Sequence, residues 1–257
     1  MKATQPATRP TAPIRTPLVV ALGSRALRGD VATAVESIAD LAWDHDVVVA
    51  HATEPAGTIA HRLEQGLNAA LPGREIATVH MRSVVGADEV RTIRWLMAEG
   101  VLVICGSGGP PTVVDAARSA AAVDHDLATA LLAACLGAEA LLMLTDVRGV
   151  EHEWGTAHAR TLRRATPEDL RSMAFADGSM GPKVRAACRF VEATGAPAAI
   201  GALADARALL DGRCGTTVQT IHARLWADCD GARDRLSLVP AAVARSLDAS
   251  PARGLSA

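Results

Sequence analysis

Short apolar runs rich in Val, Ile, Leu and Ala recur along the chain and alternate with longer segments that have helical spacing. Runs that are apolar at successive positions, without polar alternation, are typical of strands buried on both faces of a sheet. Six runs therefore predict strands, at residues 18–23, 46–52, 76–81, 101–109, 140–147 and 197–203.

Helix-length segments rich in Ala, Leu, Glu and Arg separate these strands. They predict helices at approximately residues 30–44, 58–70, 88–98, 126–136, 167–174 and 182–194. Thr166 before Pro167 is typical of a capped helix start, and Pro182 lies near another first turn. The alternation of strand and helix predicts an α/β fold, a three-layer αβα sandwich around a mainly parallel central sheet.

The organised part of the chain is expected to begin near Pro17. Residues 1–16 are rich in Pro and Thr and lack periodicity, so we expect a disordered leader. Residues 17–218 form the predicted domain, and residues 219–257 a C-terminal extension with a modest helical pattern, "PAAVARSLDAS".

Composition excludes several classes of partner. The 26 basic and 28 acidic residues nearly balance, so we expect neither a nucleic-acid nor a membrane partner. The five cysteines form no CxxC pair and the eight histidines no HExxH pattern, so no metal site of protein ligands is predicted. No signal peptide and no apolar run of about 18 residues is recognisable, which favours a cytoplasmic protein.

Four predicted strand ends carry residues suited to ligand binding, because ligands bind parallel sheets where the strands end. These ends are Gly23-Ser24, residues 51–57, the stretch "CGSGGPP" at 105–111, and Thr145-Asp146. Glycines in the third stretch allow a backbone to approach an anion, although a tight turn explains them equally well. The loop matches neither GxxxxGK[ST] nor GxGxxG.

Two polar features stand at predicted helix starts. In Asp124-His125-Asp126, the simplest interpretation makes Asp126 a helix N-cap. Lys183 follows "DGSMGP" in a chain whose only other lysine is Lys2. A cation at a helix N-terminus opposes the helix dipole, so either a bound anion retains Lys183 or it is a solvated surface residue.

Taken together and in order, several stretches resemble the carbamate kinases of the amino acid kinase family. The matching stretches are "PLVVALGSRAL", "VICGSGGPPTVV", "AVDHDLATALLA", "AEALLMLTDVRGV", "TPEDLRSMAFADGSMGPKVRAACRFVEATGAPAAIGAL" and "GRCGTTV". The resemblance covers residues 17–218 and implies the amino acid kinase fold, with an eight-stranded, mainly parallel sheet. It implies an acceptor half at about 17–120, a nucleotide half at about 121–218, and a homodimer.

The implied reaction is ATP plus carbamate to ADP plus carbamoyl phosphate, and its reverse. ATP or ADP is the implied cofactor, with Mg²⁺ bound through the nucleotide. By resemblance, Lys183 bridges the phosphates and Asp126 holds the basic groups in place. The phosphate and acceptor residues would be Gly23, Ser24, His51, Gly106, Ser107, Gly108 and Gly109. The nucleotide residues would be Thr145, Asp146, Val147, Met180 and Lys183.

The chain also departs from the family pattern. Arg25 stands where the family has asparagine, and His125 replaces a phosphate-binding lysine. The acceptor loop at 51–57 lacks a glycine and an amide, and the lid-like subdomain before residue 101 is missing. One hypothesis is an active phosphotransferase with Lys183, His125 and Arg25 as its cations. The alternatives are a catalytically impaired protein that binds nucleotide as a sensor or partner, and a kinase with a changed acceptor.

Overall fold

A computed structural model describes residues 16–52, 58–81, 85–107, 125–175 and 180–220, and it is built around one sheet. The strands of this sheet are β1 (Pro17–Leu22), β2 (Asp46–Ala52), β3 (Ile76–Met81), β4 (Leu102–Ser107), β5 (Ala140–Thr145), β8 (Arg164–Ala165), β9 (Ala198–Ala202) and β10 (Thr216–Val218). Their order across the sheet is β3-β4-β2-β1-β5-β9-β10-β8. Every neighbouring pair is parallel except β9 and β10, so the predicted mainly parallel sheet is confirmed.

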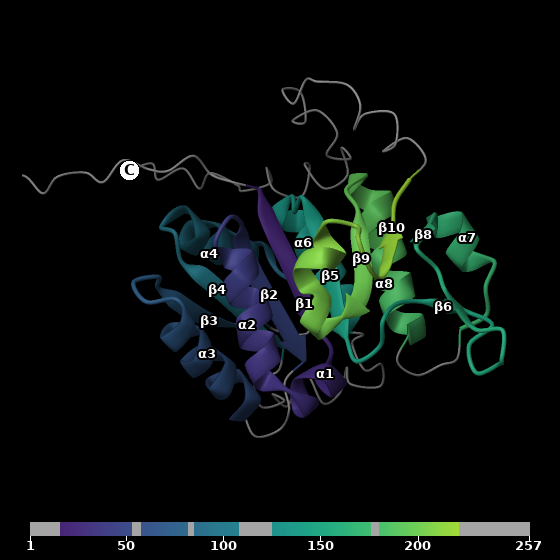
Figure 1. The fold of residues 1–257 in the computed structure, drawn as a ribbon. Coiled ribbons are helices and arrows are strands. Elements are labelled where there is room, and N and C mark those ends of the chain that lie inside the picture. Colours follow the sequence, from purple (N-terminus) through teal and green to yellow (C-terminus); the bar gives the residue numbers. More distant parts are fainter. Residues whose placement is uncertain (1–15, 53–57, 82–84, 108–124, 176–179, 221–257) are drawn as a thin grey trace, which may run out of the picture.

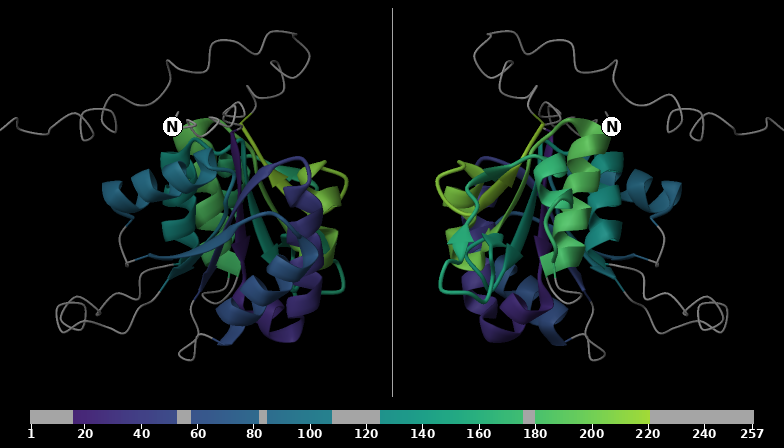
Figure 2. Two further views of the ribbon diagram at one scale, coloured as in Figure 1. Left: turned by 90° about the vertical axis from the view of Figure 1, so that its left-hand side faces the viewer. Right: turned by 90° about the vertical axis from the view of Figure 1, so that its right-hand side faces the viewer.

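Helices cover both faces of the sheet (Figure 2). They are α1 (Ser24–Gly29), α2 (Val31–Ala42), α3 (Thr58–Ala70), α4 (Ala87–Ala98), α6 (His125–Leu136), α7 (Pro167–Arg171), α8 (Met180–Thr194), α9 (Ala206–Leu210) and the 3-10 turn η1 (Leu203–Asp205). One core cluster joins the sheet to α1, α2, α3 and α9, and the other joins it to α4, α6, α7 and α8. The predicted three-layer αβα sandwich is therefore confirmed.

Strand β1 shows how a single strand contributes side chains to both core clusters. Leu18, Val20 and Leu22 pack toward α2 and α3, whereas Val19 and Ala21 pack toward α6 and α8. All five are at most 3% exposed. Because successive strand residues point to opposite faces, only a continuous apolar run can bury both faces.

Local capping explains where several helices begin. Asp30 caps α2 by accepting a hydrogen bond from the Thr33 amide at 2.9 Å. Thr166 and Asp169 form a reciprocal capping box at the start of α7, as Thr166-Pro167 suggested. The helix predicted at 167–174 is shorter than expected, since α7 ends at Arg171 with Ser172 as its C-cap.

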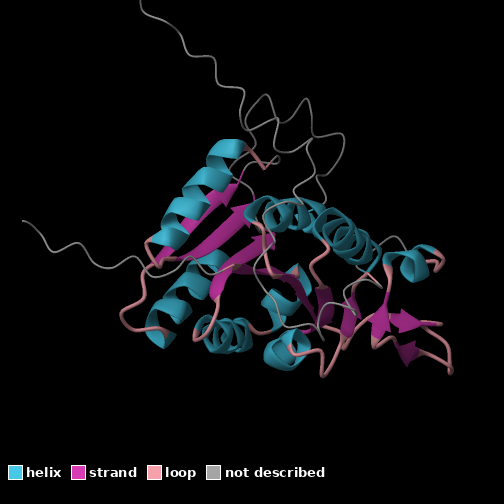
Figure 3. Ribbon diagram, turned by 90° about the horizontal axis from the view of Figure 1, so that it is seen from above, coloured by secondary structure: helices cyan, strands magenta, loops and turns pink. Residues whose placement is uncertain are grey.

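The part of the molecule beyond the sheet's β8 edge is small and irregular. A second sheet pairs β6 (Glu151–His152) with β7 (Arg160–Thr161) in antiparallel fashion. Figure 1 shows β6, β8 and α7 at one end of the molecule, with β3 at the other, and Figure 3 shows the same elongation from above. These two-residue strands were not predicted, because they are too short to show periodicity.

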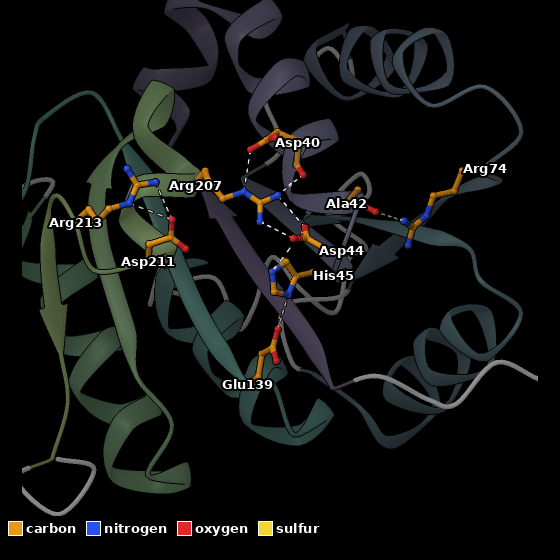
Figure 4. Close-up of polar contacts among 9 residues, drawn as sticks. All are labelled: Asp40, Ala42, Asp44, His45, Arg74, Glu139, Arg207, Asp211 and Arg213. Carbon is orange, nitrogen blue, oxygen red and sulfur yellow. Dashed lines mark hydrogen bonds and ion pairs between the residues drawn. The ribbon is translucent and has the colours of Figure 1, made fainter. Parts of the chain in front are cut away.

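A polar cluster, which we call the Arg207 clamp, joins α9 to the end of α2 (Figure 4). Arg207 Nε donates to Asp40 Oδ2 at 3.0 Å, and Arg207 Nη2 donates to Asp44 Oδ1 at 2.8 Å. The hydrogen bond from Arg207 lowers the pKa of Asp44. Beside it, His45 Nδ1 lies 2.8 Å from Glu139 Oε1. The clamp lies where β2 and β5 begin, at the edge opposite the strand ends that bear the candidate site.

Three described tryptophans, Trp43, Trp95 and Trp154, are 81%, 63% and 74% exposed. None of the helices in the described ranges is long and apolar enough to cross a bilayer. All of the predicted leader except Thr16, and most of the predicted C-terminal extension, lie outside the described residues, so the domain boundaries stay predictions.

Candidate active site

The candidate site lies along the carboxyl ends of the central parallel strands. The strand register places Leu22 of β1 opposite His51 of β2 and opposite Leu144 of β5. His51 is in turn opposite Gly106 of β4. Gly23, His51, Gly106 and Thr145 therefore lie at one edge of the sheet, as predicted.

Lys183 and Asp126 form an ion pair between the first turns of α8 and α6. Lys183 Nζ donates to Asp126 Oδ1 at 2.8 Å and to Oδ2 at 3.0 Å. The side chains are only 11% and 13% exposed, so the pair is largely desolvated. Such a pair holds both side chains in place, because separating them would leave a buried charge without compensation. Lys183 is therefore not a solvated surface lysine.

Gly23 brings the end of β1 close to this ion pair. Its amide donates to Leu144 O at 2.9 Å. A Cβ at this position would lie 3.1 Å from Leu144 O, 3.6 Å from Lys183 Cε and 3.8 Å from Lys183 Nζ. Glycine thus allows the close strand contact and leaves the space beside the ammonium group without a side chain.

Ser24 and Arg25 begin α1 directly after Gly23, and the Arg25 side chain is exposed. Arg25 therefore does not share the buried setting of Lys183. Its proposed role among the cations stays a prediction.

His125, the first residue of α6, is held in a largely buried position beside Lys183. Burial is the main cause that lowers the pKa of His125 to about 4, and the nearby His51 and Lys183 contribute to the same shift. The imidazole is therefore neutral near pH 7 in the ligand-free chain. A role as a cation, which the resemblance suggested, would require nearby phosphate oxygens to raise this pKa. Asp124 lies outside the described residues.

The lowered pKa of His125 predicts acid sensitivity of the fold. The unfolded chain is protonated at His125 below about pH 6.5, whereas the folded chain is protonated there only below about pH 4. Stability is therefore lost as pH falls through this window, by about 3 kcal/mol. Urea unfolding at pH 7 and pH 4 should show a loss smaller by this amount in His125→Gln than in the native chain.

The matched control is His158→Gln, which removes an exposed imidazole. We expect it to keep the native acid dependence. Equal losses of stability in the native chain and in His125→Gln would contradict the burial of a neutral His125.

The predicted nucleotide residues lie at the end of β5 and the start of α8. Thr145 is buried, and its Oγ1 donates to Asp146 Oδ1 at 2.9 Å. Val147 is 38% exposed, and Met180 opens α8 as a half-buried residue packed against the core. Lys183 belongs to α8, which packs against β5. The nucleotide contacts themselves stay predictions.

The predicted acceptor side contains one residue that sequence reasoning missed, His80. On this side, the predicted residue His51 is 2% exposed, and a Cβ on Gly106 would lie 3.4 Å from His51 Nε2. The same Cβ would lie 3.9 Å from Nδ1 of His80, the next-to-last residue of β3, on the other side of β4. The signal that could have identified His80 is its place near the end of a predicted strand. Ser107 ends β4, while Gly108 and Gly109 lie outside the described residues.

The fold and this edge define an α/β protein with a buried lysine, fixed by a carboxylate, where parallel strands end. Residues 62–202, more than half of the chain, match the model of the amino acid kinase family. The chain belongs to the amino acid kinase family.

Among curated proteins, several carbamate kinases are similar to about half of this chain. The carbamate kinase of Escherichia coli O6:H1 is 44% identical over 146 residues, which cover 56% of this chain and 48% of that protein. The carbamate kinase of Pyrococcus furiosus is 40% identical over 141 residues, covering 52% and 45%. The chain thus spans about half the length of the curated relatives it matches.

Solved structures show the same fold. Carbamate kinase from Giardia lamblia bound to AMP-PNP superimposes with a TM-score of 0.69 at 25% identity, covering 80% of this chain and 98% of that one. N-acetylglutamate synthase from Neisseria gonorrhoeae gives a TM-score of 0.58 at 16% identity, covering 79% and 61%. The second likeness concerns the fold alone.

Proposed function

We propose that this chain is an ATP-dependent phosphotransferase of the carbamate kinase type. It would interconvert ATP plus carbamate with ADP plus carbamoyl phosphate. The observation that supports this most is the Lys183–Asp126 pair beside Gly23, because it puts a fixed ammonium group next to a position with no side chain. The similarity to carbamate kinases over 146 residues supports the same reaction.

In this proposal, catalysis rests on positioning and on neutralising charge. The phosphoryl group would lie over Gly23, where its oxygens could accept hydrogen bonds from Lys183. Asp126 keeps Lys183 in one orientation, so little reorganisation accompanies transfer. Carbamate would attack in line from the His51 and Gly106 side while ADP leaves toward β5 and α8.

ATP or ADP and Mg²⁺ are the proposed cofactors. In the described part of the chain, no three His, Cys, Asp or Glu side chains come close enough to hold a metal ion. Asp126 is engaged by Lys183 through both of its oxygens. The donor set therefore suits a Mg²⁺ ion carried by phosphate oxygens, which would neutralise charge on the transferring group.

Purified protein should form ATP from ADP, Mg²⁺ and carbamoyl phosphate, measured by a coupled assay. A calorimetric titration with ADP should be run in parallel. ADP binding without ATP formation would contradict the carbamate reaction and favour a nucleotide sensor or a changed acceptor. Absence of ADP binding would contradict the nucleotide site itself.

We further propose that the protein is cytoplasmic and that it forms a homodimer, the assembly implied by the resemblance. Sedimentation equilibrium should give twice the chain mass of 26.6 kDa. A monomer at micromolar concentration would contradict the dimer.

A further inference from the structure

The buried hydroxyl of Thr216 joins β10 to the short antiparallel hairpin of β6 and β7. Thr216 is 0% exposed. Its Oγ1 accepts a hydrogen bond from the Val150 amide at 2.9 Å and donates one to Leu162 O at 2.6 Å. Val150 immediately precedes β6, and Leu162 immediately follows β7. One side chain therefore holds both ends of the hairpin.

This hydroxyl stands where the hairpin would otherwise have a backbone hydrogen bond. Glu151 is paired with Thr161, so the same register puts Val150 opposite Leu162. A hydrogen-bonded antiparallel pair exchanges two N–H···O bonds. Leu162 donates the first to Val150 O at 2.8 Å, but the Val150 amide reaches Leu162 O only through Thr216 Oγ1. The hydroxyl thus sets the spacing of the two segments and satisfies both backbone groups.

The same contact fixes one end of the loop that carries the predicted nucleotide residues. Residues 146–148 are exposed and lie between two buried anchors. At the first anchor, Thr145 is paired with Ala202 of β9. At the second, Val150 is 0% exposed and donates to Thr216. Because the anchors are only five positions apart, the place of Val150 determines the path of the exposed loop.

Gly149 allows the loop to lie directly against the hydroxyl. A Cβ at Gly149 would lie 2.9 Å from Thr216 Oγ1 and 2.8 Å from Thr161 Cγ2, closer than side-chain carbons come. Thr216 is therefore packed against the backbone of this loop as well as hydrogen-bonded to it.

We propose that Thr216 is a positioning residue for nucleotide binding, which fixes residues 146–148 through its hydroxyl and does not itself touch the nucleotide. This inference rests on the proposed function for the identity of the ligand. A loop that is fixed beforehand binds more tightly, because less ordering accompanies binding. The Lys183–Asp126 pair belongs to α8 and α6, so phosphoryl transfer should depend little on Thr216.

Thr216→Val keeps the shape of the side chain and removes the hydroxyl. The Val150 amide and Leu162 O then lose their partner or close on each other, and either change shifts the loop. The Kd for ADP with Mg²⁺, measured by calorimetric titration of the full chain, should rise about tenfold. In the coupled assay, the KM for ADP should rise equally while kcat stays near the native value. Thr216→Ser, which keeps the hydroxyl, should restore the native affinity.

Thr217→Val is the matched control, because it makes the same change at the next residue of β10. Successive strand residues point to opposite faces, and Thr217 Oγ1 lies toward Gly212, 3.9 Å from the position of a Cβ there. We expect Thr217→Val to bind ADP as the native chain does. Circular dichroism of each variant verifies the fold before titration.

Amide hydrogen exchange of the ligand-free chain supplies a readout that needs no nucleotide. Exchange at residues 146–150 should be faster in Thr216→Val than in the native chain and in Thr217→Val. Unchanged exchange would overturn the proposal, and so would an ADP affinity that Thr216→Val leaves unaltered. A native chain that binds no ADP would contradict the proposed function, whereas exchange at residues 146–150 still decides whether Thr216 holds the loop.

Discussion

Replacing Lys183 by alanine is expected to lower ATP formation from ADP and carbamoyl phosphate by about a thousandfold. The ammonium group is the described cation nearest the position over Gly23, and a preorganised donor of this kind contributes on the order of 10² to 10³ in rate. The initial rate of the coupled assay at saturating ADP measures the loss. Retention of more than about a tenth of the native rate would contradict the assigned role of Lys183.

Loss of the lysine also leaves Asp126 as a largely buried carboxylate without its cation, which by itself destabilises the fold. The double variant Lys183→Ala/Asp126→Ala removes both charges. We expect it to regain stability in urea unfolding but not activity. Arg189→Gln removes an exposed cation from the same helix and is the matched control, expected to keep the native rate.

Gly215→Ala is expected to lower the free energy of unfolding by about 3 kcal/mol or more. Gly215 has a φ of +64°, and a Cβ there would lie 2.2 Å from Leu209 Cδ1 and 2.7 Å from Ile200 O. Leu209 can change rotamer, but the carbonyl of Ile200 belongs to β9 and cannot move without disturbing its pairing with β10. Urea unfolding followed by circular dichroism measures the change.

Gly212→Ala supplies the comparison that separates backbone strain from the clash. Gly212 has a similar φ of +66°, but its Cβ would meet only Thr217 Oγ1, at 3.9 Å. Arg163 donates to the carbonyls of both glycines. The free energy of unfolding should therefore fall by only about 1 kcal/mol in Gly212→Ala. This is the cost of the left-handed conformation for alanine, less the gain from a stiffer unfolded chain. Equal losses at the two positions would show that the contact with Ile200 is unimportant.

The central strands of the sheet were predictable because they are buried on both faces, as in β1 and β5. Residues 46–52 and 76–81 form β2 and β3 with the predicted bounds. The short α9 and β10 were not predicted. Their conformation depends on contacts such as the antiparallel pairing of Thr216 with Ile200, which no local pattern encodes.

The candidate site was only partly predictable from sequence. Gly23, Asp126 and Lys183 were identified, and the structure brings them together. The protonation of His125 could not be derived, because its pKa depends on burial and on His51 and Lys183, which are distant in sequence. His80 was missed because it joins the site only through the register of β3 with β4.

The exposed tryptophans decide how this protein can be observed in solution. The chain has four tryptophans and no tyrosine, so indoles dominate its ultraviolet emission. Trp43, Trp95 and Trp154 already contact water in the folded state. Their emission should hardly shift when the fold is lost. The same solvent contact makes them accessible to collisional quenchers, so iodide should extinguish much of the native fluorescence.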